Sequence, residues 1–264
     1  MVFTKNSEKL MDYFLNDIDT YSKKRTIKIQ TKCDKIFKMI HNDILITDRY
    51  VNFLYKKNKI TFEIKEIANL SQISKKELLK SNYVDKNCYD YINDNIQGIF
   101  TLVTNISNLK VKINYAIFNK NEFNNLKKIE KTLLHALKIV RLCNMYRKKE
   151  TVKTLDIFLF LTPMKKKLPK NSIDILGPDN CNSAVTFACA SAGELLIYRN
   201  EEWKKTLIHE LFHSLCLDFS LMNYNKLKHN ISTLFDIKSE FLISETYSEF
   251  WACIINSCFC SYSF

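Results

Sequence analysis

Apolar residues in the first 107 positions recur mainly at spacings of three and four, which is the period of an amphipathic helix. On this pattern we expect four helices, over Ser7–Tyr21, Lys28–Ile46, Glu63–Lys80 and Asn87–Thr104. We find no residues with recognisable chemistry in this half of the chain. Residues 1–107 are therefore expected to form a mostly helical N-terminal region, whose role the sequence leaves open.

The pattern changes at Leu109, where apolar and polar residues begin to alternate as they do in a half-buried strand. We expect first a strand over Leu109–Ile117, a helix over Asn121–Lys148 and a strand over Leu155–Thr162. A loop over Pro163–Asn182 then leads to two short strands, over Ser183–Ala190 and Glu194–Arg199. The chain is expected to end with a helix over Glu201–Leu217, a loop from about Asp218 to Asn230, and a last helix from Ser232 or Ser239 to Cys258. This mixture predicts an α+β fold over residues 108–264. We place a soft boundary near residue 107, and the two parts can still share one core.

The helix expected over Glu201–Leu217 contains the motif His-Glu-x-x-His. Residues four positions apart project from the same face of a helix, so His209 and His213 can offer both imidazoles to one metal ion. Glu210 is turned about 100° from His209 and can lie beside the metal without being a ligand. The alternative is a buried helix with two hydrogen-bonded histidines, but the charge of Glu210 would then need a partner. The motif therefore favours a zinc site.

A catalytic zinc usually has three protein ligands and an open position for water. Asp218, five residues after His213, can be a ligand, cap the helix or orient a histidine. On the next predicted helix, Glu245 and Glu249 are four residues apart and share a face. If that helix packs on the first, Glu245 can bind zinc and Glu249 can bind the free ring nitrogen of a histidine ligand. Glu240 is an alternative ligand.

The two motifs resemble those of the gluzincin peptidases, the thermolysin-like superfamily. In that family the third ligand is the glutamate of a Glu-x-x-Ser/Ala-Asp pattern, which is matched here by the segment from Glu245 to Glu249, with glutamate in place of the usual aspartate. The asparagine often found before the ligand is Ser244 here. The resemblance covers roughly residues 108–264. It implies a zincin-like core with His209, His213 and Glu245 as zinc ligands.

The same resemblance implies a mechanism, in which Glu210 is the general base and Glu249 or Asp218 orients a histidine. It also implies that an extended peptide substrate pairs with an edge strand just before the active helix. That strand would be Ser183–Cys189, and its substrate-binding positions would be Ala184, Val185, Thr186 and Phe187. A residue that stabilises the transition state cannot be assigned. The candidates are His229, Tyr224 and Tyr247.

Residues 193–220 also resemble uncharacterised proteins of nucleocytoplasmic large DNA viruses, a similarity that supplies no substrate. The formal net charge of +12 would suit nucleic acid or an anionic membrane. The basic residues are nevertheless spread along the chain, and no nucleic-acid motif is present. A lysine-rich solvated surface explains the charge, and nucleic acid is a partner that no motif supports.

The nine cysteines are irregularly spaced, and the N-terminus lacks the core of a signal peptide. We therefore expect reduced thiols and a cytoplasmic location, in the host cytoplasm or the virion if the protein is viral. No apolar stretch approaches the roughly 20 residues that span a bilayer.

Together these features predict a zinc-dependent hydrolase, and specifically a peptidase that acts on a peptide or protein substrate. Two alternatives belong to other classes. One is a catalytically inactive zinc-binding domain with a structural or interaction role, and the other is a basic nucleic-acid-associated viral protein. Substrate, cleavage specificity and oligomeric state cannot be read from the sequence.

Overall fold

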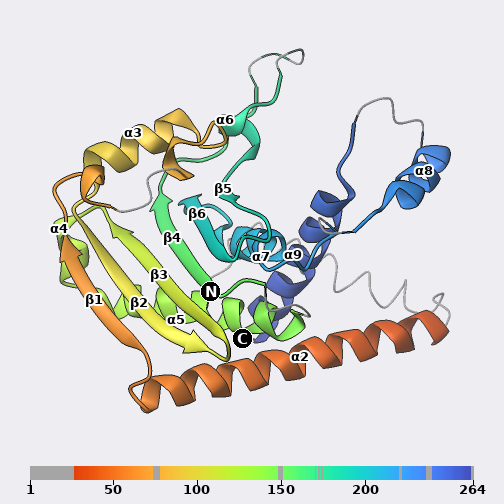
Figure 1. The fold of residues 1–264 in the computed structure, drawn as a ribbon, viewed down its shortest axis with the longest axis horizontal. Coiled ribbons are helices and arrows are strands. Elements are labelled where there is room, and N and C mark those ends of the chain that lie inside the picture. The colour runs from red at the N-terminus through yellow and green to blue at the C-terminus, as the bar shows by residue number, and fades with distance from the viewer. Residues whose placement is uncertain are drawn as a thin grey trace, which may run out of the picture.

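A computed structural model describes residues 27–73, 78–147, 151–169, 171, 173, 175–219, 222–235 and 240–262. They form a six-stranded mixed sheet with the strand order β1-β2-β3-β4-β6-β5 (Figure 1). The strands are β1 (Thr61–Glu66), β2 (Gly98–Ile106), β3 (Leu109–Ile117), β4 (Thr154–Thr162), β5 (Ala184–Thr186) and β6 (Ala192–Arg199). Strands β3, β4 and β6 run parallel, whereas β5 pairs antiparallel with β6 and forms an edge of the sheet. The expected α+β class is therefore confirmed.

Helices cover both faces of the sheet (Figure 1). The described helices are α2 (Ile27–Lys56), α3 (Lys86–Asn95), α4 (Lys120–Phe123), α5 (Leu126–Tyr146), α6 (Pro178–Cys181), α7 (Trp203–Ser214), α8 (Asn225–Leu234) and α9 (Ile243–Tyr262), with short 3₁₀ helices η1 (Leu70–Gln72) and η2 (Leu78–Lys80). Helices α2, α5, α7 and α9 share one hydrophobic core with the sheet, and α3, η1 and η2 pack on the other face. No helix in the described ranges is both long and apolar enough to span a membrane.

The position of strand β4 between two hydrophobic cores explains why its sequence is almost continuously apolar. Ile157 and Leu159 belong to the core beneath α5 and α7, whereas Phe158 and Phe160 belong to the core beneath α3. Successive side chains of a strand point to opposite faces, so a strand covered on both sides is apolar at every position.

The N-terminal half departs most from the expected helices. The expected helix over Lys28–Ile46 is confirmed as part of α2, whereas Ser7–Tyr21 lies outside the described residues. The helix expected over Glu63–Lys80 is wrong, because its beginning belongs to β1 and its later part contains η1 and η2.

The helix expected over Asn87–Thr104 is correct only in its first half, because α3 ends at Asn95 and β2 begins at Gly98. A Cβ atom at Gly98 would lie 2.7 Å from the Phe123 ring, so glycine is required there by a close approach. The β2–β3 hairpin turns at Ser107, which has a φ of 52°. The sheet thus continues across residue 107, and both parts of the chain contribute strands to it.

The C-terminal half follows the expected order more closely. Strand β3 matches its expected bounds, and β4, β6, α5, α7 and α9 lie where strands and helices are expected. The loop expected from Asp218 to Asn230 is partly wrong, because α8 begins at Asn225. Leu227, Ile231 and Leu234 recur at helical spacing in α8, but none of the residues of this helix is buried, so it does not contribute to the core.

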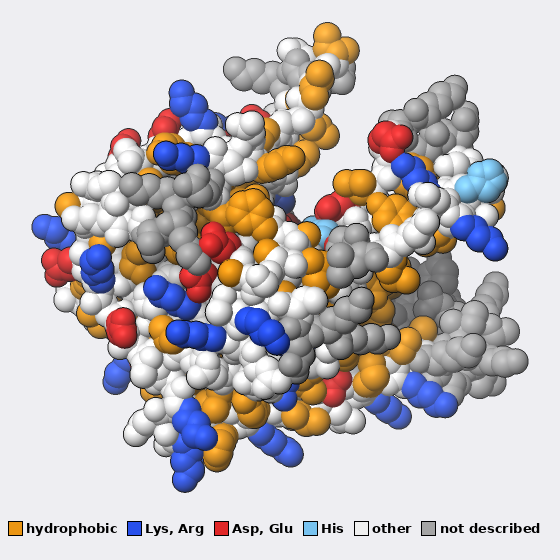
Figure 2. All heavy atoms as spheres, in the orientation of Figure 1, with side chains coloured by type: hydrophobic (Ala, Val, Ile, Leu, Met, Phe, Trp, Pro, Cys, Tyr) orange, Lys and Arg blue, Asp and Glu red, His pale blue; other side chains and the backbone are white. Residues whose placement is uncertain are grey.

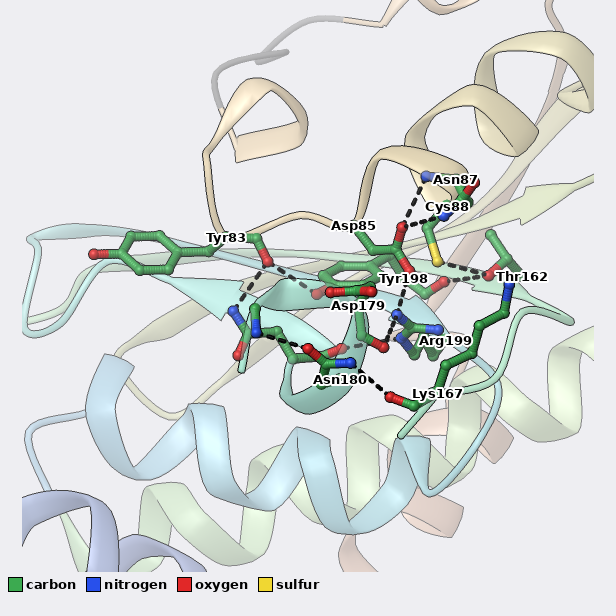
Figure 3. A network of polar contacts seen from close by, with 12 residues as sticks. Tyr83, Asp85, Asn87, Cys88, Thr162, Lys167, Asp179, Asn180, Tyr198 and Arg199 are labelled. Carbon is green, nitrogen blue, oxygen red and sulfur yellow. Dashed lines mark hydrogen bonds and ion pairs between the residues drawn. The ribbon is translucent and has the colours of Figure 1, made fainter. Parts of the chain in front are cut away.

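A buried ion pair joins α3 to the end of β6 (Figure 3). The fully buried Arg199 donates from Nη2 to Asp85 at 2.5 Å and from Nε to the Asn182 carbonyl at 3.0 Å. Asp85 also accepts from the Asn87 N–H at the start of α3. Burial alone would raise the pKa of Asp85, but the Asn87 and Arg199 hydrogen bonds and the charge of Arg199 outweigh burial and lower it. The pair fixes the chain four residues before α7 begins.

Candidate metal centre

Helix α7 is fixed by its apolar side. Leu207, Ile208, Leu211 and Phe212 lie in the core, and none of them is more than 5% exposed. Because a helix turns about 100° per residue, burial of these positions leaves the motif residues on the opposite, partly open side. His209, Glu210 and His213 are accordingly only partly buried.

Helix α9 packs against α7 and brings the second motif to this side. Ala252, Ile255 and Phe259 of α9 are buried in the core that α7 shares, and Tyr247 packs against Phe212, with ring centroids 6.1 Å apart. The sequence-predicted packing of the two helices is therefore present. It turns the face of α9 that carries the two glutamates toward the histidines.

Three ligand atoms from the two helices converge on one point, with all of them within 4.8 Å of one another. His209 Nε2 lies 3.1 Å from His213 Nε2 and 3.2 Å from Glu245 Oε2, and His213 Nε2 lies 3.4 Å from the same oxygen. Ligand atoms on a tetrahedral zinc, at 2.0–2.2 Å from the ion, are about 3.3–3.6 Å apart. The observed spacing therefore fits a single small metal ion, and the donor set of two imidazoles and one carboxylate suits zinc.

Each histidine is held from behind by a carboxylate. His209 Nδ1 lies 3.1 Å from Glu249 Oε2, and His213 Nδ1 lies 2.5 Å from Asp218 Oδ2. A carboxylate at Nδ1 keeps the proton on that nitrogen and leaves Nε2 free to bind a metal. The two carboxylates differ in exposure, since the side chain of Asp218 is 1% exposed and that of Glu249 is 46% exposed.

The acidic neighbours shift the pKa values of the histidines. Burial lowers the pKa of His213, but Asp218 and Glu245 outweigh burial and raise it to about 10. At His209, burial is likewise outweighed by the hydrogen bond to Glu245 and the charge of Glu210, so its pKa is also raised. Hydrogen bonds from the two histidines hold the pKa of Glu245 far below its ordinary value. Metal binding to such a cluster has to displace protons.

Glu210 lies beside this cluster. Burial raises its pKa to about 7, although the charges of His209 and His213 act in the opposite direction. A carboxyl group with such a pKa can accept and return a proton near neutral pH.

The other predicted residues lie outside the convergence point. The side chain of Glu240 is 90% exposed and its carboxylate pairs with Lys228 at 2.5 Å, so it is not part of the metal-binding group. Tyr247 packs on Phe219, with ring centroids 4.6 Å apart. Tyr224 precedes α8 and His229 lies on it. None of these residues provides one of the three ligand atoms.

Strand β5 occupies the edge of the sheet next to β6, at the place expected for Ser183–Cys189. It is shorter than expected, because Ala184, Val185 and Thr186 pair with β6, whereas Phe187 follows the strand and is half-exposed. Figure 2 shows acidic and histidine side chains at the base of a hollow on this face, between the segment around α6 and α8.

The sequence-based reasoning missed two features of the site. Lys205 Nζ lies 2.6 Å from Glu249 Oε1, a contact between helices that no spacing in the chain marks. Cys189 and Cys216 lie together, with their Cα atoms 5.1 Å apart, a pairing that the irregular cysteine spacing does not indicate. They are 27 residues apart in sequence, and the turn after β5 brings Cys189 to the end of α7, where its N–H donates to the His213 carbonyl.

No protein-family model matches the sequence, and no solved structure matches it. The chain is similar to an uncharacterised protein of Acanthamoeba polyphaga mimivirus, with 27% identity over 215 residues. The match covers 72% of this chain and 53% of the viral protein, so the chain spans about half the length of the relative that it matches. The expected resemblance to proteins of large DNA viruses is thereby supported, whereas the similarity assigns no activity.

Proposed function

We propose that this protein is a zinc-dependent hydrolase with a zincin-like core, and that it cleaves peptide bonds. The observation that carries the proposal is the convergence of His209 Nε2, His213 Nε2 and Glu245 Oε2 at separations of 3.1–3.4 Å. A second observation supports it, since both histidines have a carboxylate on the far nitrogen. Structural zinc sites have four protein ligands, whereas three leave one position for water or substrate, as in catalytic sites.

In the proposed reaction, His209, His213 and Glu245 would hold a zinc ion, which would supply Lewis-acid polarisation of the scissile carbonyl and lower the pKa of a water molecule. Glu210 then takes a proton from that water and delivers it to the departing amine. Its place next to His209 in the chain keeps its carboxylate beside the ligand atoms without making it a ligand. Glu249 and Asp218 keep the imidazole rings oriented throughout, because each accepts the proton of an Nδ1 atom.

Strand β5 is the proposed binding surface for the substrate backbone. It lies at the edge of the sheet, so its outer backbone groups can pair with an extended peptide. The position of such an edge strand just before the β6–α7 unit also matches the arrangement that the gluzincin resemblance implies. Val185 and Thr186 are partly exposed, which leaves room for contact with substrate side chains.

Zinc content provides the first test. Elemental mass spectrometry of the purified wild-type protein is expected to give about one zinc per chain, and Glu245→Ala is expected to lower this sharply. Glu240→Ala is the matched control, since Glu240 is a nearby glutamate that pairs with Lys228 instead. If the wild-type protein contains no zinc even after reconstitution, the metal site and the enzyme assignment are both wrong.

Turnover provides the second test, with a peptide library as the substrate. Glu210→Gln is expected to keep its zinc and to lose roughly 10²–10⁴-fold in rate, the range that a general base contributes. His213→Ala is expected to lose both zinc and activity. Stoichiometric zinc without turnover of any peptide would instead favour an inactive zinc-binding domain.

A further inference from the structure

Lys205 contacts the carboxylate that supports His209. It lies on α7, one turn before His209, and its Nζ is 2.6 Å from Glu249 Oε1. The other oxygen of the same carboxylate, Oε2, is 3.1 Å from His209 Nδ1. Glu249 therefore bridges two residues of α7, with one oxygen on the lysine and the other on the histidine.

The exposure of Glu249 explains why this bridge matters. Its side chain is 46% exposed, and a glutamate has three rotatable bonds, so the hydrogen bond to His209 and the weak one from the Cys253 thiol, 3.7 Å from Oε1, would leave it competing with water. The side chain of Lys205 is only 22% exposed, and its ammonium holds the second oxygen in a charge-assisted hydrogen bond. Glu202 lies 3.5 Å from the same Nζ atom and keeps the lysine near the surface of α7.

His213 offers a comparison within the same site. Its carboxylate belongs to Asp218, which is shorter and has a side chain that is 1% exposed. The surrounding chain already fixes that carboxylate. The two histidines are thus oriented by different means, one through burial and one through a salt bridge.

We propose that Lys205 is a positioning residue for the metal site, which acts by holding Glu249 against His209. This inference rests on the proposed zinc site. It assigns a role to a residue that contacts neither the expected metal nor a ligand directly.

The sign of the effect on zinc affinity separates positioning from simple charge. Lys205 carries a positive charge near a dication, so its removal would strengthen zinc binding if charge were all that mattered. Loss of orientation at Glu249 acts in the opposite direction, because outer-shell partners typically contribute 10–100-fold in metal affinity. Since the site is partly exposed, the Coulomb effect is weakened by solvent, and we expect the loss of orientation to win.

The experiment is a chelator-competition titration of zinc into metal-free protein. Lys205→Met keeps the length of the side chain and is expected to lower zinc affinity about 3–10-fold, a part of the range for outer-shell partners. Lys205→Arg is expected to restore most of the affinity. Lys204→Met is the matched control, because Lys204 lies over the Trp203 ring on the same helix, and it should leave the affinity unchanged.

A double-mutant cycle with Glu249→Gln tests the route of the effect. Because Lys205 is proposed to act through Glu249, Lys205→Met should not lower zinc affinity further when Glu249 is already glutamine. An equal loss in both backgrounds would overturn the inference. So would an unchanged or increased affinity in Lys205→Met alone.

A measurement on the metal-free protein gives an independent readout. The Nδ1–H proton of His209, observed by NMR, should exchange faster with water in Lys205→Met, because its carboxylate acceptor is held less firmly, while the Nδ1–H proton of His213 keeps its wild-type exchange rate. An unaltered exchange rate at His209 would contradict the proposal. If the wild-type protein binds zinc and Lys205→Met does not weaken it, only this inference fails. If the wild-type protein does not bind zinc, the proposed function fails with it.

Discussion

Two ion pairs lie at the two ends of helix α7, and they differ in what surrounds the nitrogen atoms that do not take part in the pair. Before the helix, Arg199 pairs with Asp85, and the two side chains are 0% and 6% exposed. In its last turn, His213 pairs with Asp218, and the two side chains are 12% and 1% exposed. Arg199 directs Nε and Nη2 at oxygen atoms of the protein, and its buried Nη1 has no hydrogen-bond partner among the described residues. His213 places only Nδ1 in its pair and turns Nε2 toward the point that His209 and Glu245 share.

The difference separates an ion pair that joins two elements from one that orients a candidate metal ligand. The Arg199 pair is buried and joins two elements, so its consequences are confined to stability. The His213 pair orients a nitrogen whose other neighbours are also candidate metal-ligand atoms, so under the proposed function its consequences reach zinc binding. Burial of charge does not by itself indicate a functional site. The convergence of several ligand atoms on one point indicates a candidate metal site.

The largest expected effect comes from breaking the pair of Arg199 and Asp85. Arg199→Met leaves Asp85 buried without its cation and is expected to lower the free energy of unfolding by about 3–5 kcal/mol. Urea denaturation with the chain held at one pH measures this loss. Zinc content should stay at the wild-type level in the fraction that remains folded. A loss below about 1 kcal/mol would mean that the pair is not the buried interaction that its exposure indicates.

A smaller effect is expected from a histidine without an acidic partner. His135 packs between the rings of Trp203 and Phe259, and burial, with the charges of Lys204 and Lys138, lowers its pKa from 6.5 to about 4. The unfolded chain therefore takes up this proton first. Stability is fully present above about pH 6.5 and is lost as the pH falls toward about 4, by at most about 3 kcal/mol.

The contribution of His135 can be isolated with His135→Leu. This variant cannot protonate at that position, so the difference in unfolding free energy between it and the wild type should shrink or reverse between pH 7 and pH 4. Denaturant titrations at several pH values measure the difference. A difference that stays constant with pH would show that His135 titrates normally.

The smallest of the three effects is expected from the pair of His213 and Asp218. Asp218→Asn keeps an acceptor near His213 but removes its charge, and it is expected to lower zinc affinity about 10–100-fold with little change in unfolding free energy. Competition with a chelator of known affinity measures it, and Glu240→Gln serves as the control. If Asp218→Asn destabilised the fold and spared zinc affinity, the comparison between the two pairs would be reversed.

Prediction from sequence succeeded where the structure depends on side-chain direction within a single helix or strand. The strand at Leu109–Ile117 and the helix around the His-Glu-x-x-His motif follow from periodicity, because side-chain direction repeats within an element. It failed at Glu63–Lys80, where short apolar spacings compatible with a helix belong to β1 and two 3₁₀ helices. There, pairing with β2 outweighs local preference.

The sequence by itself determined the two spacings of four that place His209 with His213 and Glu245 with Glu249, because the helical period fixes directions within one helix. Only the tertiary structure decided how the two faces meet. The packing of α9 on α7 sets Glu249 on His209, and the turn after α7 sets Asp218 on His213. Contacts between elements depend on the shapes of buried side chains and on loop paths, which no local periodicity in a single chain records.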